Sequence, residues 1–182
     1  MNRRSLLFAS AGGAWLLLTG HSPYRRFQIY RKTRLIVMAA NEDKRAAVIA
    51  DGLAEFFAKT WTESQSISGR AQTAPDLVQL LVTNQLEVGV LCKKEARAAR
   101  EGKNRFSRSG PQALCVLAIF GDHVLITRED LLEPIAVKIL EPMTKQWQLV
   151  KAEVSQSALG PFAGEATGLP LHRVAVGFAK KS

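Results

Sequence analysis

The strongest constraint on the fold is the alternation of short apolar runs with helical patterns between residues 30 and 96. In its clearest part, 76–91, apolar residues recur at three- and four-residue intervals, and a compact apolar run follows. This order predicts a helix over 75–83 and a buried strand over 87–92. An earlier apolar run at 35–39 predicts another strand, buried on both faces. Strands that alternate with helices are typical of α/β domains.

Capping residues indicate where two helices begin. Asn41 or Asp43 can cap the helix that follows the first strand, because their side chains accept hydrogen bonds from free backbone N–H groups. Thr73 can cap the next helix, and Asp76 suits the positive end of its dipole. Between the two helices, the alternation of polar and apolar residues over 62–71 predicts a second, more polar strand.

A strongly basic stretch follows at residues 93–110. It contains seven Lys or Arg residues against two Glu residues, and it includes Gly102 and Gly110. An excess of one charge around glycines is typical of solvated loops. We therefore expect a mobile basic loop here, and one helical turn near 95–100 is the alternative for part of it.

Two apolar runs, 113–120 and 123–128, flank the pair Gly121-Asp122. They predict either a hairpin or one long bent strand with a bulge at the glycine. A helix is expected over 129–147, with Pro142 ending or kinking it. The small and loop-forming residues of 156–168 predict a loop, and a short apolar element closes the chain.

The first 22 residues are typical of an export signal. Arg3 and Arg4 precede an apolar run of about a dozen residues, which is short for a membrane span and resembles a twin-arginine signal peptide. No small-x-small cleavage site follows, so the alternative is a short anchor in the inner membrane. We expect a periplasmic protein with a signal or anchor at 1–22 and one domain at 30–178.

The formal net charge of +9 would suit an anionic partner. Nucleic acid is not favoured, because the sequence contains no recognisable nucleic-acid-binding motif. Cys92 and Cys115 could form a disulfide in an oxidising periplasm if their strands are neighbours, or they could be two free thiols. Neither cysteine has a Cys or His partner at a zinc-ligand spacing, so we expect no metal and no cofactor.

The sequence contains no established catalytic motif. Asp122 and His123 could form an acid–base pair, but a structural role at a turn is the favoured interpretation. We therefore expect no catalytic residues and no enzyme. His172 is expected to pack or to contact a partner.

Three stretches carry a resemblance to a known family: 76–91, 114–130 and the closing segment Gly168-Leu169-Pro170-Leu171-His172. Together they resemble the periplasmic solute-binding proteins of tripartite ATP-independent (TRAP) transporters, specifically the TAXI group. The resemblance implies a type II periplasmic binding protein-like fold with a mostly parallel sheet flanked by helices. Members have two lobes and about twice this length, so it implies a single lobe here. The glycine-rich turn that members place after their first strand is absent from this sequence.

Ligands of open α/β sheets bind beyond the carboxyl ends of the strands. This rule predicts ligand contacts at Asn41 and Glu42 after the first strand, at Thr73 and Asp76 at the second helix, and at Arg128 after the hairpin. An anionic solute would use Arg128 and the N–H groups near Thr73. The alternative is that these residues only cap helices and face solvent.

Together these observations predict an exported solute-binding protein, acting as a binding or accessory subunit related to TRAP transporter receptors. The expected ligand is a small organic anion or an amino acid, and the expected protein partner is a membrane transporter subunit or another exported protein. Two chains could also pair as a homodimer to imitate a two-lobed receptor. The alternative is an interaction protein that has lost solute binding and docks a membrane component or an exported partner through its basic segment.

Overall fold

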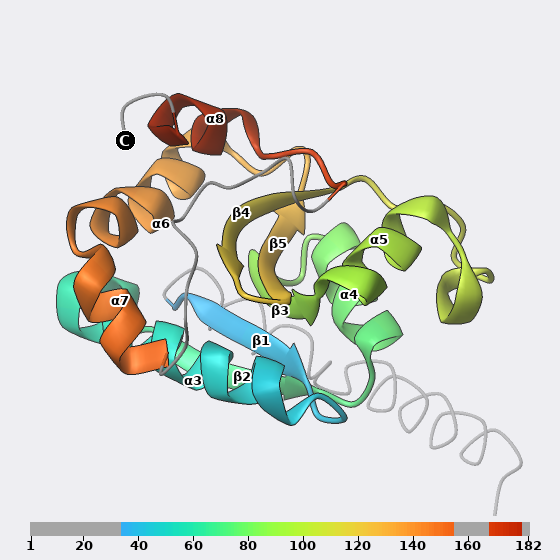
Figure 1. Cartoon of the computed structure of the whole chain (residues 1–182), viewed down its shortest axis with the longest axis horizontal. Coiled ribbons are helices and arrows are strands. Elements are labelled where there is room, and N and C mark those ends of the chain that lie inside the picture. Colours follow the sequence, from blue (N-terminus) through green and yellow to red (C-terminus); the bar gives the residue numbers. More distant parts are fainter. Residues whose placement is uncertain (1–33, 155–167, 180–182) are drawn as a thin grey trace, which may run out of the picture. The chain divides into compact units, whose positions relative to one another are not determined.

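The computed structural model describes residues 34–154 and 168–179 (Figure 1). The predicted export segment at 1–22 and nearly all of the predicted loop at 156–168 lie outside these residues. Within the described part of the chain, no helix combines the length and the apolar character needed to cross a bilayer.

The described strands form one open five-stranded sheet with the order β2-β1-β3-β5-β4. The strands are β1 (Ile36–Ala40), β2 (Ile67–Ala71), β3 (Val88–Cys92), β4 (Leu114–Phe120) and β5 (His123–Arg128). β1 pairs in parallel with β2 and β3, whereas β5 pairs antiparallel with β3 and β4. β5 alone therefore runs against the other strands. The expected α/β class is confirmed, and the sheet is mixed.

Helices cover both faces of the sheet (Figure 1). One core contains residues of α3 (Lys44–Thr60), α6 (Glu133–Lys145), α7 (Trp147–Val154) and α8 (Arg173–Ala179). A second core, on the other face, contains residues of α4 (Ala74–Val82) and α5 (Lys93–Glu101). β1 and β3 lie in the middle of the sheet and contribute to both cores, as their continuous apolar runs predicted.

Two helices begin at the same edge of the sheet, and each begins at a capping residue. Asp43 is the N-cap of α3, and its Oδ1 accepts a 2.9 Å hydrogen bond from the N–H of Ala46. Thr73 and Asp76 form a reciprocal capping box at the start of α4. Both predicted caps are confirmed. Since β1 and β2 are parallel, these helix starts follow strand ends at the same edge.

The hairpin between β4 and β5 is also confirmed, and Gly121 takes the positive φ of 57° that its turn requires. A shift in register between Val116 and Ala118 distorts β4. Near it, Val116 and Leu171 form an isolated parallel bridge, so the closing segment adds to the edge of the sheet.

The prediction of a mobile loop at 93–110 is wrong. Half of the basic stretch is the helix α5, which Gly102 ends with a left-handed φ of 65°. Ala96 and Ala99 are fully buried, and Phe106, in a short 3-10 turn η2 (Asn104–Phe106), is 1% exposed. Burial of small and aromatic side chains thus orders a segment that its charges had predicted to be a solvent-exposed loop.

Two other boundaries differ from the predictions. The polar second strand begins only at Ile67, because residues 62–64 form a 3-10 turn, η1 (Thr62–Ser64). The helix expected over 129–147 begins at Glu133, runs past Pro142 to Lys145, and is followed by α7.

Candidate functional site

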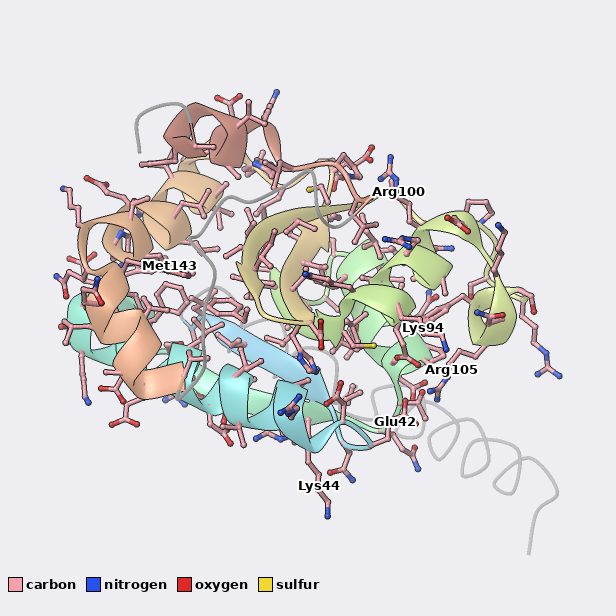
Figure 2. All side chains as sticks on the ribbon, viewed as in Figure 1. Glu42, Lys44, Lys94, Arg100, Arg105 and Met143 are labelled. Carbon is pink, nitrogen blue, oxygen red and sulfur yellow. The ribbon has the colours of Figure 1, made fainter. Side chains whose placement is uncertain are left out.

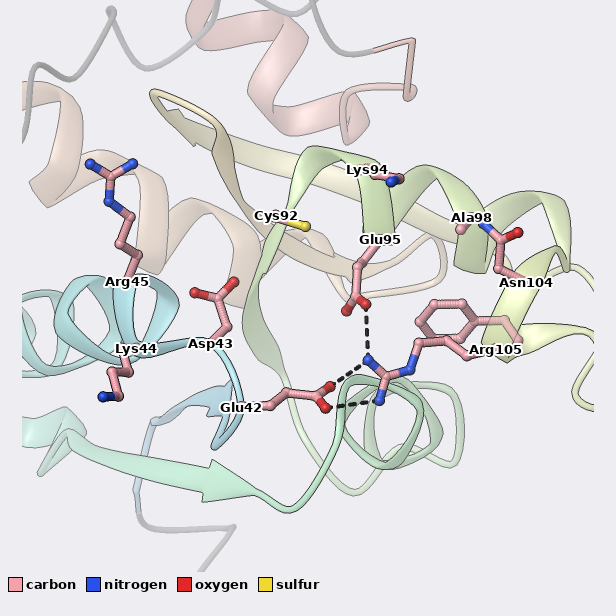
Figure 3. A pocket seen from close by; sticks show the side chains of 11 residues that line it. Glu42, Asp43, Lys44, Arg45, Cys92, Lys94, Glu95, Ala98, Asn104 and Arg105 are labelled. Carbon is pink, nitrogen blue, oxygen red and sulfur yellow. Dashed lines mark hydrogen bonds and ion pairs between the residues drawn. The ribbon is translucent and has the colours of Figure 1, made fainter.

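An open cavity of about 840 Å³ lies beyond the carboxyl ends of β1 and β3. Within the sheet, β2 and β3 lie on opposite sides of β1. The chain goes from β1 to β2 and then crosses to β3, so the gap between β1 and β3 is the switch point of the topology. Ligands of open α/β sheets bind at such points. The cavity is lined by Glu42, Asp43, Lys44, Arg45, Cys92, Lys94, Glu95, Ala98, Asn104, Arg105 and Phe106 (Figure 3).

Three segments supply this lining. They are the loop and first turn of α3 after β1, the end of β3 with the start of α5, and the turn η2. Glu42, Lys44, Lys94 and Arg105 lie on the same side of the domain, whereas Met143 lies in the core on the α6 side (Figure 2).

Asp43 is bonded on both of its carboxylate oxygens. Oδ1 caps α3, and Oδ2 lies 3.1 Å from Nε2 of His123. His123 is 5% exposed and begins β5, opposite Cys92 on β3. The imidazole therefore pairs with the carboxylate that caps α3 and not with its neighbour Asp122. This contact fixes β5 to the start of α3.

Glu42 is held by two groups. Its Oε1 accepts a 3.0 Å hydrogen bond from the N–H of Ala74, the first residue of α4, and its two oxygens pair with both Nη atoms of Arg105. These hydrogen bonds to the charged form lower the pKa of the Glu42 carboxyl, with the Arg105 guanidinium as the largest cause. Glu42 is therefore ionised at neutral pH and already has its partners.

The third carboxylate, Glu95, also pairs with Arg105, at 3.1 Å from Nη1. By contrast, among the described residues the side chains of Lys44, Arg45 and Lys94 have no hydrogen-bond or ion-pair partner, and all three are exposed. The acidic groups of the cavity are thus bonded within the protein, and three cationic groups remain available. The cavity is suited to an anion.

Cys92 offers a thiol to the cavity, at the N-cap of α5. Burial raises the pKa of this thiol, although the N–H groups of Glu95 and Lys94 oppose the shift. Among the described side chains, no hydrogen bond joins Cys92 to His123. Cys92, His123 and Asp43 therefore lack the hydrogen-bonded relay that joins the members of a catalytic triad.

Both cysteines are free thiols in the structure. β5 separates β3 from β4 in the sheet, so Cys92 and Cys115 are not on neighbouring strands. The described residues also contain no group of three His, Cys, Asp or Glu side chains that could hold a metal ion.

Four of the five predicted ligand residues lie at this edge of the sheet. Glu42 lines the cavity, and Asn41 precedes it with an exposed side chain. Thr73 and Asp76 bond to each other in the capping box, outside the cavity lining. The structure therefore brings these four residues to one region, with only Glu42 facing the cavity.

Arg128 lies at the opposite edge, because β5 runs antiparallel to β3 and its end meets the start of β3. Its guanidinium donates to the carbonyl of Leu86 and pairs with Glu87 and Asp130. The expected joint anion site of Arg128 with the N–H groups near Thr73 is therefore not formed. Arg128 is 8% exposed and ties the end of β5 to the start of β3.

Sequence reasoning missed most of the cavity residues, namely Asp43 as a site residue, Lys44, Arg45, Cys92, Lys94, Glu95 and Arg105. The signal that could have found α5 and its residues is the spacing of Ala96 and Ala99 directly after an apolar strand, with a glycine at 102. No local sequence pattern indicated that Arg105 would line the cavity.

Fold and site together define an open α/β domain with a charged cavity at the switch point of its sheet. No protein-family model matches the chain, and no curated protein matches it.

Proposed function

We propose that this protein binds a small organic anion in the cavity at the switch point, and that it is a periplasmic binding or accessory subunit related to the solute receptors of TRAP transporters. The observation that carries the proposal is the charge arrangement of the cavity. Its three carboxylates are bonded internally, whereas Lys44, Arg45 and Lys94 have no partner among the described residues.

The strand order supports the relationship to solute receptors. The parallel core β2-β1-β3 creates one switch point, and α3 and α5 both begin beside it. Helix N-termini carry a partial positive charge, which adds to that of the three cationic side chains. The resemblance of 76–91, 114–130 and 168–172 to the TAXI group supplies the type II periplasmic binding protein-like fold and the transport role.

Cys92 allows a direct test of occupancy. It lines the cavity, whereas Cys115 is 2% exposed and burial raises its pKa to about 12. At pH 8 only about one Cys115 thiol in ten thousand is ionised, and the thiolate is the reactive form. An alkylating reagent should therefore modify Cys92 first, and a ligand in the cavity should slow that reaction.

The experiment measures the rate of Cys92 alkylation by mass spectrometry in the presence of succinate, citrate, glutamate or inorganic phosphate. A thermal-shift screen with the same compounds runs in parallel, since a ligand at a hundred times its dissociation constant adds about 2.7 kcal/mol. Lys94→Gln should weaken protection by a bound anion. Lys93→Gln is the matched control, because it removes the same charge from the same helix outside the cavity lining.

Protection in the wild type that falls in Lys94→Gln and persists in Lys93→Gln supports the proposal. If no compound slows alkylation or raises the melting temperature, anion binding is refuted. The interaction protein that docks a membrane or exported partner through 93–108 is then the remaining interpretation. Cell fractionation of the full chain tests the export that residues 1–22 predict.

A further inference from the structure

Arg105 is the one lining residue that contacts two carboxylates of the cavity at once among the described residues (Figure 3). Nη1 lies 2.7 Å from Oε1 of Glu42 and 3.1 Å from Oε1 of Glu95, and Nη2 lies 2.9 Å from Oε2 of Glu42. The Glu42 contact is bidentate, which is the strongest geometry for a guanidinium and a carboxylate. The Glu95 contact is single and longer.

The two carboxylates differ in how firmly they are held. Glu42 also accepts the N–H of Ala74, so it is fixed to the start of α4. Glu95 lies in the first turn of α5, and among the described residues its side-chain carboxylate pairs with Arg105 alone. Loss of the Glu95 contact would therefore leave Arg105 still oriented by Glu42.

The backbone around Arg105 is held in place by its neighbours in the sequence. Phe106, the next residue, is 1% exposed in the core beside α4 and α5. Gly102 ends α5 with two hydrogen bonds from 102 and 103 back to the last turn of the helix. The guanidinium of Arg105 can thus exchange partners in the cavity without displacement of the backbone that supports it.

We propose that Arg105 is a ligand-binding residue that Glu95 occupies in the empty protein, and that an anionic ligand binds by displacing Glu95 from Nη1. This inference rests on the proposed anion binding in the same cavity. Glu42 is the positioning residue, because it keeps the guanidinium directed into the cavity. Glu95 is an internal competitor, which lowers the affinity of any anion that must displace it from Arg105.

Succinate is the probe, and its dissociation constant is measured by isothermal titration calorimetry at constant ionic strength. Glu95→Gln keeps the size of the side chain and removes its charge. Partly exposed ion pairs of this kind contribute modestly, so the expected gain is about two- to fivefold tighter binding. Glu101→Gln is the matched control, because it removes a carboxylate from the same helix outside the cavity.

A general field effect of the lost charge must be separated from the release of Arg105. In an Arg105→Gln background, Glu95→Gln should give no further gain, because the contact it breaks no longer exists. Glu95→Asp provides a second variant, which keeps the charge and shortens the side chain, and it should also bind succinate more tightly. Circular dichroism melts show that each variant is folded.

Wild-type binding without a gain in Glu95→Gln refutes the competition and leaves the proposed function standing. An equal gain in the presence and absence of Arg105 also refutes it, because the effect would then be one of charge alone. Binding by Glu95→Gln but not by the wild type supports the inference. Absence of binding in every variant refutes both the inference and the proposed function.

Discussion

Gly52 in α3 lies close to the backbone of α7, and this contact gives a prediction whose sign can be worked out. A Cβ atom built on Gly52 would lie 2.5 Å from the carbonyl oxygen of Glu153 and 2.9 Å from its carbonyl carbon, both in the backbone of α7. The neighbour is backbone and cannot rotate away. For an ordinary contact of 3.4 Å, α7 must move back from α3 by about 0.9 Å.

Two effects of Gly52→Ala oppose each other. Overpacking of a close-packed core costs about 1–3 kcal/mol. Alanine in a helix interior gains about 0.8–1.0 kcal/mol over glycine. The net expectation is a loss of about 1 kcal/mol in the free energy of unfolding, which lowers the melting temperature by about 2–4 °C for a domain of this size.

Gly177 in α8 offers the matched control, because a Cβ atom added there meets nothing within 4 Å. Gly177→Ala should therefore be neutral or stabilising by up to about 1 kcal/mol. Urea unfolding of both variants measures the difference, and an unchanged m-value shows that the unfolding transition is comparable. If Gly52→Ala is as stable as the wild type or more stable, the close packing of α3 on α7 is wrong.

Two further predictions concern capping and pH. Thr73→Ala removes the cap of α4 and should lower the free energy of unfolding by about 1 kcal/mol in the same urea experiment. Thr73→Ser keeps the capping hydroxyl and should lose only a small part of this stability. Burial lowers the pKa of His172, whose neutral ring faces the carbonyl of Leu131 and accepts the N–H of Val174. Its contribution is therefore fully present above the unfolded-state pKa of about 6.5 and is lost as the pH falls below it, because the unfolded state takes up the proton first. Stability measured from pH 7.5 to pH 5 should fall less in His172→Gln than in the wild type, and equal slopes would contradict the assignment.

The features that the sequence predicted correctly depend on a few neighbouring residues. Thr73 and Asp76 are three positions apart, which is the spacing that a capping box requires, so the start of this helix could be predicted from the local sequence. The turn at Gly121-Asp122 requires one residue with positive φ between two apolar runs. In each case the residues that determine the structure lie within four positions of one another in the sequence.

The features that were mispredicted depend on tertiary partners. Charge suggested a loop at 93–110, but burial of Ala96, Ala99 and Phe106 stabilises a helix and a fixed turn. Arg128 was placed with the ligand residues because it ends a strand, yet the direction of β5 moves that end to the opposite edge. Strand direction and helix burial follow from the whole sheet and not from local pattern.

Glu42 shows why the electrostatics of this cavity cannot be separated from its fold. The same carboxylate accepts the N–H at the start of α4 and orients Arg105, so any substitution of Glu42 changes helix capping and ligand contacts together. The Glu95 carboxylate makes no second hydrogen bond: it contacts Arg105 alone among the described residues, and its only other effect is a favourable interaction with the start of α5. A change in anion affinity on substitution of Glu95 can therefore be assigned to the cavity, whereas the same change at Glu42 would have two causes.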